Sequence, residues 1–270
     1  MSLLLCRQEP VTAPYYVEAL GVHLYSSQEL CYVIFHHPLL VMEDFVDERL
    51  TAFLRSELRM PFLAERIEKW LESRGESDEL LFQILQDCSY LNAKEQADFR
   101  QTVTAFRKLP KEEYEKKRAD YFYQLKLYGK AIAMYERILE AEREKPLSEE
   151  FKARVWNNIA SCYTKLFCYQ KAMHAYDCAW NAKEDPVFIE RMYLLTVMEP
   201  ELAVKEKFLG MMTEEKREEW DRLAEEASEE ARNAEEVSQM EELFSRDPVK
   251  RLAGAGEALN RWKVEYRRCL

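Results

Sequence analysis

The stretch that decides the fold runs from Ala153 to Lys183 and reads ARVWNNIASCYTKLFCYQKAMHAYDCAWNAK. Its apolar and small residues recur at helical spacing in two consecutive runs, which predicts two helices that pack antiparallel. Small side chains at Ala160 and Ala172 allow the helices to approach closely, and tyrosine rings fill the space between them. The apolar faces are Trp156, Ile159, Ala160 and Tyr163 in the first run, and Tyr169, Ala172, Tyr176 and Ala179 in the second.

This arrangement resembles a tetratricopeptide repeat, a helical hairpin of about 34 residues that recurs in tandem. The resemblance is carried by Trp156, Ile159, Ala160, Tyr163, Ala172, Tyr176, Ala179 and a displaced Pro186. It implies an all-α fold in which antiparallel helical hairpins stack into a right-handed superhelix. It also implies that the protein binds a protein or peptide in the concave groove of that superhelix.

One hairpin cannot bury its apolar face alone, so a neighbouring repeat is expected. A second copy of the pattern precedes the first. Its members are Ala119, Phe122, Tyr128, Ala131, Tyr135 and Ile138. The equivalent residues Ala131 and Ala172 lie 41 positions apart. We expect the extra residues around Ala141–Glu150 to form a longer second helix or a longer turn between repeats. Downstream, Val187–Val197 predicts a helix that stacks as a degenerate half repeat.

We expect four parts in the chain: an N-terminal arm with a short buried helix (1–42), an N-terminal helical module (43–110), the repeats (111–212) and C-terminal capping helices (213–270). In the first part, Tyr15–Tyr25 predicts a short strand or an extended arm, and Ser26–Glu29 predicts a capping box that starts a helix. The second part reads as four helices, the first over Glu43–Leu58 and the fourth opened by a capping box at Asn92 and Glu95.

The C-terminal part reverses its charge along its length. Between 213 and 246 there are thirteen Asp/Glu against five Lys/Arg, which predicts one long acidic helix over Thr213–Phe244. Its thin apolar face favours a solvated helix that caps the last repeat, with a two-stranded coiled coil as the alternative. The segment Asp247–Leu270 has six Lys/Arg against three acids. We expect it to fold back antiparallel on the acidic helix, because the opposite charges attract.

Composition excludes several classes of protein. Six Gly and nine Pro in 270 residues, with 33% charged residues, favour long helices over an all-β fold. A net charge of −11 argues against a nucleic-acid partner, which needs a basic surface, and against an anionic membrane. The start MSLLLCRQEP lacks the basic region of a signal peptide, no apolar run reaches membrane-spanning length, and the seven cysteines include no C-x-x-C pair. We therefore expect a cytoplasmic protein without a membrane partner.

The sequence contains no constellation that predicts catalysis. His36 and His37 are adjacent, which is poor geometry for one metal ion, and Gly254–Gly256 is only a fragment of a dinucleotide-binding loop. Ser161 lies in the middle of a predicted helix, away from the strained turn that a nucleophilic serine needs. We expect no enzyme, no catalytic residue, no cofactor and no metal.

The expected binding site is the groove lined by the first helix of each hairpin. It comprises Lys116, Lys117, Asp120, Tyr123, Gln124, Arg154, Asn157, Asn158, Ser161, Lys165 and Arg191. This set is neutral to basic and rich in amides and hydroxyls, so it suits an extended peptide or an acidic tail. Lys116 and Asn158 match two positions with which one subclass of the family grips a C-terminal carboxylate, but Asp120 stands where that subclass has Asn.

These observations predict a non-enzymatic adaptor or scaffold that recruits a protein or peptide through the groove. A chaperone-like holdase or secretion cofactor is the first alternative, suggested by the acidic surface and the short stack of repeats. A regulatory sensor that responds to a peptide or ligand is the second. The sequence leaves the identity of the partner and the oligomeric state open.

Overall fold

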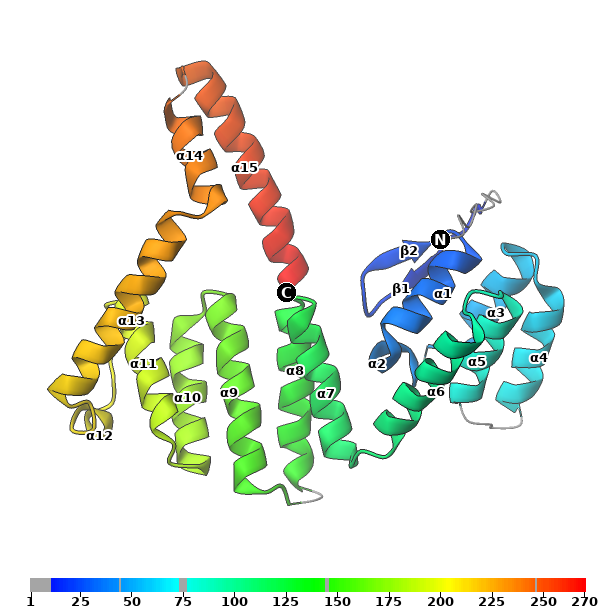
Figure 1. Ribbon diagram of the computed structural model, residues 1–270, viewed down its shortest axis with the longest axis horizontal. Helices are drawn as coiled ribbons and strands as arrows, with labels where there is room; N and C mark the ends of the chain where they lie inside the picture. The colour runs from blue at the N-terminus through cyan, green and yellow to red at the C-terminus, as the bar shows by residue number, and fades with distance from the viewer. Residues whose placement is uncertain (1–10, 44, 73–76, 144–145, 246) are drawn as a thin grey trace. The chain divides into compact units, whose positions relative to one another are not determined.

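A computed structural model describes residues 11–43, 45–72, 77–143, 146–245 and 247–270 (Figure 1). These residues are mostly helical, as the composition predicts, with one two-stranded sheet near the start. The predictions made for residues 1–10 fall outside them. Contacts divide the chain into two compact units, up to Tyr114 and from Glu115 onward. None of the helices in the described ranges is both long and apolar enough to cross a bilayer.

The first unit begins with an antiparallel hairpin of β1 (Tyr15–Val17) and β2 (Val22–Leu24). Tyr15 pairs with Leu24 in the register, and both side chains are buried. The turn contains Gly21 at φ +68°, a backbone conformation that glycine adopts without steric cost. Of the two alternatives predicted for this segment, the strand is confirmed.

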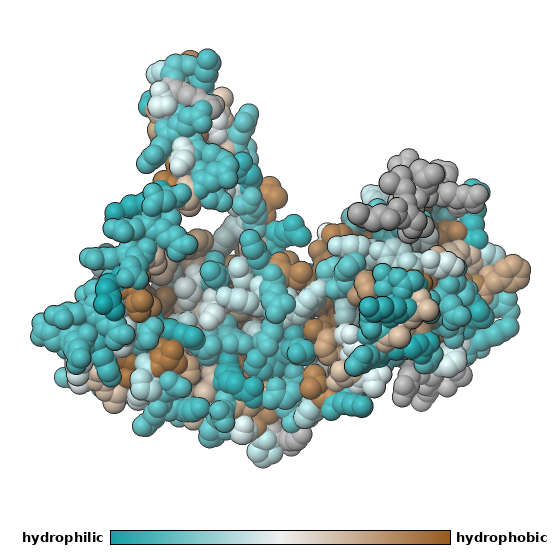
Figure 2. All heavy atoms as spheres, viewed as in Figure 1, coloured by the Kyte–Doolittle hydropathy of each residue, from teal (hydrophilic) through white to brown (hydrophobic). Residues whose placement is uncertain are grey.

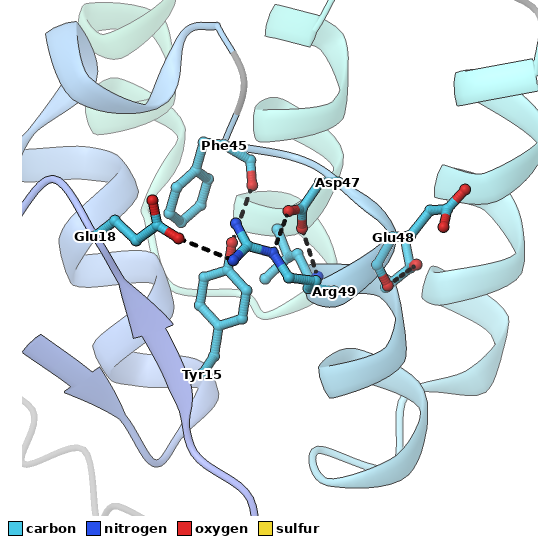
Figure 3. Close-up of polar contacts among 8 residues, drawn as sticks. Tyr15, Glu18, Phe45, Asp47, Glu48 and Arg49 are labelled. Atoms are coloured by element: carbon cyan, nitrogen blue, oxygen red, sulfur yellow. Dashed lines mark hydrogen bonds and ion pairs between the residues drawn. The ribbon is translucent and has the colours of Figure 1, made fainter.

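Tyr15 attaches the hairpin to the helices that follow (Figure 3). Its ring packs edge-on against Phe45, with 5.9 Å between ring centroids, and its hydroxyl donates to the Phe45 carbonyl at 3.3 Å. Arg49 lies beside this contact, where it pairs with Asp47 at 2.7 Å and with Glu18 at 3.0 Å. Burial, and next the negative charge of Asp47, raises the pKa of Tyr15 to about 12.

The rest of this unit is helical: α1 (Ser27–His36), α2 (Pro38–Val41), α3 (Glu48–Ser56), α4 (Pro61–Glu72), α5 (Ser77–Asp87) and α6 (Ala93–Arg107). The prediction of a helix from Glu43 was wrong, because α3 begins five residues later. Asp47 caps it by accepting the N–H of Leu50 at 2.8 Å. Phe45 is buried although it precedes the helix, so an apolar residue at this place in the sequence did not indicate that the helix had begun.

Two capping boxes were predicted in this unit, and only the one at Asn92 is complete. At α6, the Asn92 side chain accepts the N–H of Glu95 at 3.0 Å, and the Glu95 carboxylate accepts the N–H of Asn92 at 2.9 Å. At α1, Ser26 accepts the N–H of Glu29 at 3.2 Å, but the Glu29 carboxylate binds the N–H of Tyr25 instead of the cap residue itself. Both cap side chains, Ser26 and Asn92, satisfy amides that a helix start leaves without partners.

The hairpin region is formed by α7 (Lys111–Gln124), α8 (Tyr128–Glu140), a 3₁₀ turn η1 (Ala141–Arg143), α9 (Glu149–Lys165), α10 (Tyr169–Ala182) and α11 (Pro186–Met198). Within it, α8 packs on α9, α9 on α10 and α10 on α11 (Figure 1). The small residues Ala119, Ala131, Ala160, Ala172 and Ala179 are all buried, as predicted. Trp156, Tyr163 and Tyr169 are only half-buried.

The extra residues between the two hairpins form a connection and do not lengthen the second helix. The helix α8 ends at Glu140 and continues only as the turn η1, and α9 begins after Ser148, which accepts the N–H of Phe151 at 3.2 Å. After α11, the short helix α12 (Glu206–Leu209) places Phe208 edge-on against Trp180, with 5.6 Å between ring centroids.

The C-terminal arm consists of α13 (Glu214–Arg232), α14 (Glu235–Ser245) and α15 (Pro248–Cys269). The prediction of one acidic helix was therefore wrong. The break lies at Asn233, whose side-chain amide donates to the carbonyl of Glu229 at 2.9 Å and so satisfies the end of α13. The fold-back prediction is correct only for α14, against which α15 packs.

The far end of α15 reaches the hairpin region instead of following α13. The Tyr266 hydroxyl donates to the carbonyl of Leu166 at 3.4 Å, in the turn between α9 and α10. The carbonyl of Leu270 lies so close to Gly129 on α8 that a Cβ there would overlap it. The arm therefore both leaves the hairpin region and returns to it (Figure 1).

Candidate functional site

Asp120 on α7 is the centre of a polar cluster between the helices of the hairpin region. Lys116, one turn earlier, places Nζ 2.8 Å from one carboxylate oxygen. The hydroxyl of Tyr135 on α8 donates to the other oxygen at 2.5 Å, and the side-chain amide of Asn158 on α9 donates to that oxygen at 2.9 Å. Three donors from three helices therefore converge on one carboxylate.

The buried position of Tyr135 explains why a carboxylate is needed beside its hydroxyl. Its ring is completely buried between the helices, so its hydroxyl requires a partner inside the protein. Asp120 accepts from it, and Asn158 donates to it at 3.2 Å. Burial, and next the hydrogen bond to Asp120, raises the pKa of Tyr135 above its usual value. The hydroxyl is therefore protonated and acts as a donor throughout the physiological range.

The cluster extends from α9 to α11. Asn157 donates to the side-chain oxygen of Asn158 at 3.2 Å, and Arg191 on α11 donates to the side-chain oxygen of Asn157. We call the connected set Lys116, Asp120, Tyr135, Asn157, Asn158 and Arg191 the polar network. It links α7, α8, α9 and α11, so it fixes the positions of four helices with hydrogen bonds in addition to their apolar packing.

A pocket of about 380 Å³ opens beside the polar network. It is lined by Asp120, Tyr123, Gln124, Tyr135, Asn158 and Ser161. The Tyr123 ring is held edge-on against Tyr128, with 5.3 Å between ring centroids, and Ser161 donates to the backbone carbonyl of Asn157 at 3.0 Å. The exposed amide of Gln124 offers both a donor and an acceptor. The pocket thus presents an aromatic ring, amides and a hydroxyl from fixed helices.

The structure brings together most of the residues predicted for the groove. Five belong to the polar network, namely Lys116, Asp120, Asn157, Asn158 and Arg191. Tyr123, Gln124 and Ser161 line the pocket beside Asp120 and Asn158. The remaining three lie apart: Lys117 and Arg154 are exposed, with the Arg154 guanidinium 5.3 Å from the Phe151 ring, and Lys165 borders a second pocket.

The second pocket, of about 680 Å³, lies where the end of α15 meets the hairpin region. It shares Gln124 with the first pocket, and it is also lined by Leu125, Lys126, Tyr128, Lys165, Glu265, Arg268 and Cys269. Sequence reasoning missed the last three residues, because it placed α15 along the acidic helix. No local pattern in the sequence indicates that α15 ends at α8.

Sequence reasoning also missed Tyr135, which it assigned to the apolar core. A tyrosine at a fully buried position signals a buried hydroxyl, and that hydroxyl needs a polar partner. Asp120 on the preceding helix α7 was a candidate for that partner.

The polar network changes the expected electrostatics of the groove. The Lys116 side chain is 11% exposed and its charge is offset by Asp120, so it is not an available cation for a carboxylate. Among the described residues, no group of three or more His, Cys, Asp or Glu side chains is placed to hold a metal ion. The site is therefore built for hydrogen bonding at low net charge.

Comparisons of the chain with protein-family models, curated protein sequences and solved structures give no significant match. The resemblance to tetratricopeptide repeats accordingly depends on the residues of the hairpin region, and the function is inferred from the geometry of the site.

Proposed function

We propose that this protein is a non-enzymatic adaptor whose hairpin region is a tetratricopeptide-like superhelix. In this proposal the pocket beside Asp120 receives an extended segment of a protein partner. The observation that carries the proposal is the convergence of Tyr123, Gln124 and Ser161 beside the polar network. Fixed amides and hydroxyls pair with the N–H and C=O groups of an extended backbone, and an aromatic ring contacts its side chains.

The charges at the pocket decide between the two classes of ligand considered for the groove, because none of the described residues that line the pocket is a cation and the nearby Lys116 is offset by Asp120. An acidic tail or a terminal carboxylate needs an available cation to offset the cost of leaving water. A neutral stretch of extended peptide needs donors and acceptors, which the pocket supplies. We therefore propose an internal extended segment as the ligand, and not a C-terminal carboxylate.

A displayed library of random peptides tests this proposal without knowledge of the natural partner. We expect the wild-type chain to enrich a family of peptides, and Ser161→Trp to lose that enrichment at least about tenfold, because the indole fills the pocket. Gln170→Trp, at an exposed position on α10 outside the pocket, is the matched control and should select the same peptides as the wild type. Equal selection by Ser161→Trp would refute the proposal.

A further inference from the structure

The helix α15 has an apolar stripe that is open to solvent. Leu252, Leu259 and Tyr266 recur every seven residues, and Ala255 and Trp262 lie between them at the spacing of a coiled-coil seam. Leu252 is 78% exposed, Leu259 48% and Trp262 43%. The helix α14 packs against α15 near its start, where Leu243 contacts Gly254 and Ala255 of the stripe is half-buried.

The acidic helix α13 has a matching open stripe. Trp220 near its start is buried, but Leu223 is 42% exposed and Ala227 and Ala231 are exposed as well. Glu219, Glu226 and Glu230 lie on the same side as Leu223, at offsets of minus four, plus three and plus seven. In Figure 2, which has the same view as Figure 1, hydrophilic residues cover most of the arm, with hydrophobic residues between them.

The helices that carry the two stripes have opposite net charge. The helix α15 carries six Lys/Arg and two Asp/Glu, a net of +4, whereas α13 and α14 together carry thirteen Asp/Glu and four Lys/Arg, a net of −9. Lys250 pairs with Asp247 at 3.8 Å. Arg251 and Lys263 flank the stripe of α15, and within the described residues no carboxylate lies at ion-pair distance from either.

These complementary stripes do not meet within one chain because each helix is held elsewhere. The start of α13 is fixed on α11, where the Tyr193 hydroxyl donates to Asp221 at 2.7 Å and the Tyr193 ring lies 5.3 Å from that of Trp220. The end of α15 is fixed at Gly129 and Leu166. The two helices are connected through α14 and diverge from it toward different helices of the hairpin region (Figure 1).

We propose that a second copy of this chain covers the two stripes, with the basic α15 of each copy on the acidic α13 of the other. This arrangement is two-fold symmetric, so each copy contributes one helix to each of two identical pairs. The stripe from Leu252 to Tyr266 gives a seam of about 21 Å, enough for two heptads. An anionic membrane suits the stripe less well, because the carboxylates of α14 lie beside it and would be repelled.

Sedimentation equilibrium of the 270-residue chain over a range of concentrations and salt tests this proposal. We expect a dimer at low salt that weakens at high salt, because screening reduces the attraction between the arms. Two charge-reversal variants probe the residues that flank the two stripes, R251E/K263E on α15 and E219K/E226K/E230K on α13. Each variant alone should raise the dimer Kd about tenfold or more, and an equimolar mixture of the two should restore dimers. Restoration requires that α15 of one copy meets α13 of the other.

All the reversed residues are exposed, and circular dichroism verifies the helix content of each variant. Phe62→Glu, at a side chain that is 83% exposed on α4, is the matched surface control and should leave the dimer unchanged. A wild-type monomer at every concentration would overturn the proposal. A dimer Kd that the charge reversals leave unchanged would also overturn it, as would an equimolar mixture of the two variants that forms no dimers. Binding of monomers to vesicles of phosphatidylserine and phosphatidylcholine through α15 would replace it with a membrane surface.

Discussion

The carboxylate of Asp120 holds three helices together by accepting hydrogen bonds from Lys116, Tyr135 and Asn158. The hydroxyl of Tyr135 is buried with its ring, and Lys116 is nearly so. We expect Asp120→Ala to lower the free energy of unfolding by about 2–3 kcal/mol, because it strands a buried hydroxyl and a charge. Urea denaturation measures the loss. Glu218→Ala, an exposed carboxylate on α13, should change the stability by less than about 0.5 kcal/mol.

Should Asp120→Ala prove as mild as Glu218→Ala, the polar network would not contribute to stability in the way its geometry indicates. The Tyr135→Phe variant gives an independent reading, because it removes the donor together with its need for Asp120. We expect it to cost less than Asp120→Ala, since replacing one partner with a group that needs no hydrogen bond avoids a stranded polar atom.

Burial of Tyr15 raises its pKa, so the free energy of unfolding should decrease at alkaline pH. Its pKa in the folded chain is about 12, above the value of 10.0 for an unburied tyrosine. Its contribution is therefore fully present below pH 10 and is lost as the pH rises toward 12. We expect the stability difference between the wild type and Tyr15→Phe, about 1 kcal/mol at neutral pH, to decrease over that range.

Thermal unfolding followed from pH 8, below both pKa values, to pH 12 covers the whole range over which the contribution is lost. Tyr16→Phe is the matched control, because Tyr16 is the next residue in β1 and points to solvent. A constant difference between the wild type and Tyr15→Phe across that range would show that Tyr15 titrates as an exposed residue.

At the scale of elements, Gly129 determines whether α15 can dock. Alanine favours helix over glycine by about 1 kcal/mol, so Gly129→Ala should leave α8 intact or stabilise it. Its Cβ would overlap the carbonyl of Leu270, and the chain end has to move away. We expect faster amide hydrogen exchange over residues 263–269, with unchanged exchange in α8.

Gly256→Ala is the control for that experiment, because a Cβ at Gly256 meets nothing within 4 Å. It should slow exchange in α15 by raising its helix propensity, which is the opposite result. The same exchange pattern in both variants would show that α15 is not docked at Gly129.

Some elements followed from local chemistry and were predictable from the sequence. The burial of Ala131 and Ala172 and the capping box at Asn92 depend on residues within one or two turns of a helix. The break at Asn233 was not predictable, because one asparagine within an acidic run is only mildly unfavourable to a helix. The start of α3 was missed because Phe45 fits the apolar periodicity of a helix, whereas it is buried by a tertiary contact with Tyr15 of the hairpin.

The candidate site divides in the same way. Helical periodicity placed Asp120, Asn157 and Asn158 on first helices, and the structure brings these three into one network. The role of Tyr135 could not be read from periodicity, since its ring occupies a core position and only its hydroxyl reaches Asp120. The contact of α15 with Gly129 depends on the path of the whole arm, for which neighbouring residues carry no signal.

At the scale of the whole molecule, the two proposals use different surfaces. The pocket lies between α7, α8 and α9, whereas pairing between copies uses α13 and α15. Mutations should therefore separate the two activities. We expect R251E/K263E to weaken dimers without changing peptide selection, and Ser161→Trp to abolish peptide selection without changing the mass in solution. Joint loss of both properties in either variant would show that the surfaces are coupled.

The most direct measurement is calorimetric titration of a library-selected peptide against an analogue whose central backbone nitrogens are methylated. Methylation removes N–H donors of the peptide and keeps its side chains, so it isolates recognition of the peptide backbone by the pocket. We predict at least about tenfold weaker binding of the analogue to the wild type, and a similar loss when the unmodified peptide meets Ser161→Trp. Equal affinity of both peptides for the wild type, or full affinity for Ser161→Trp, would contradict peptide recognition at this site.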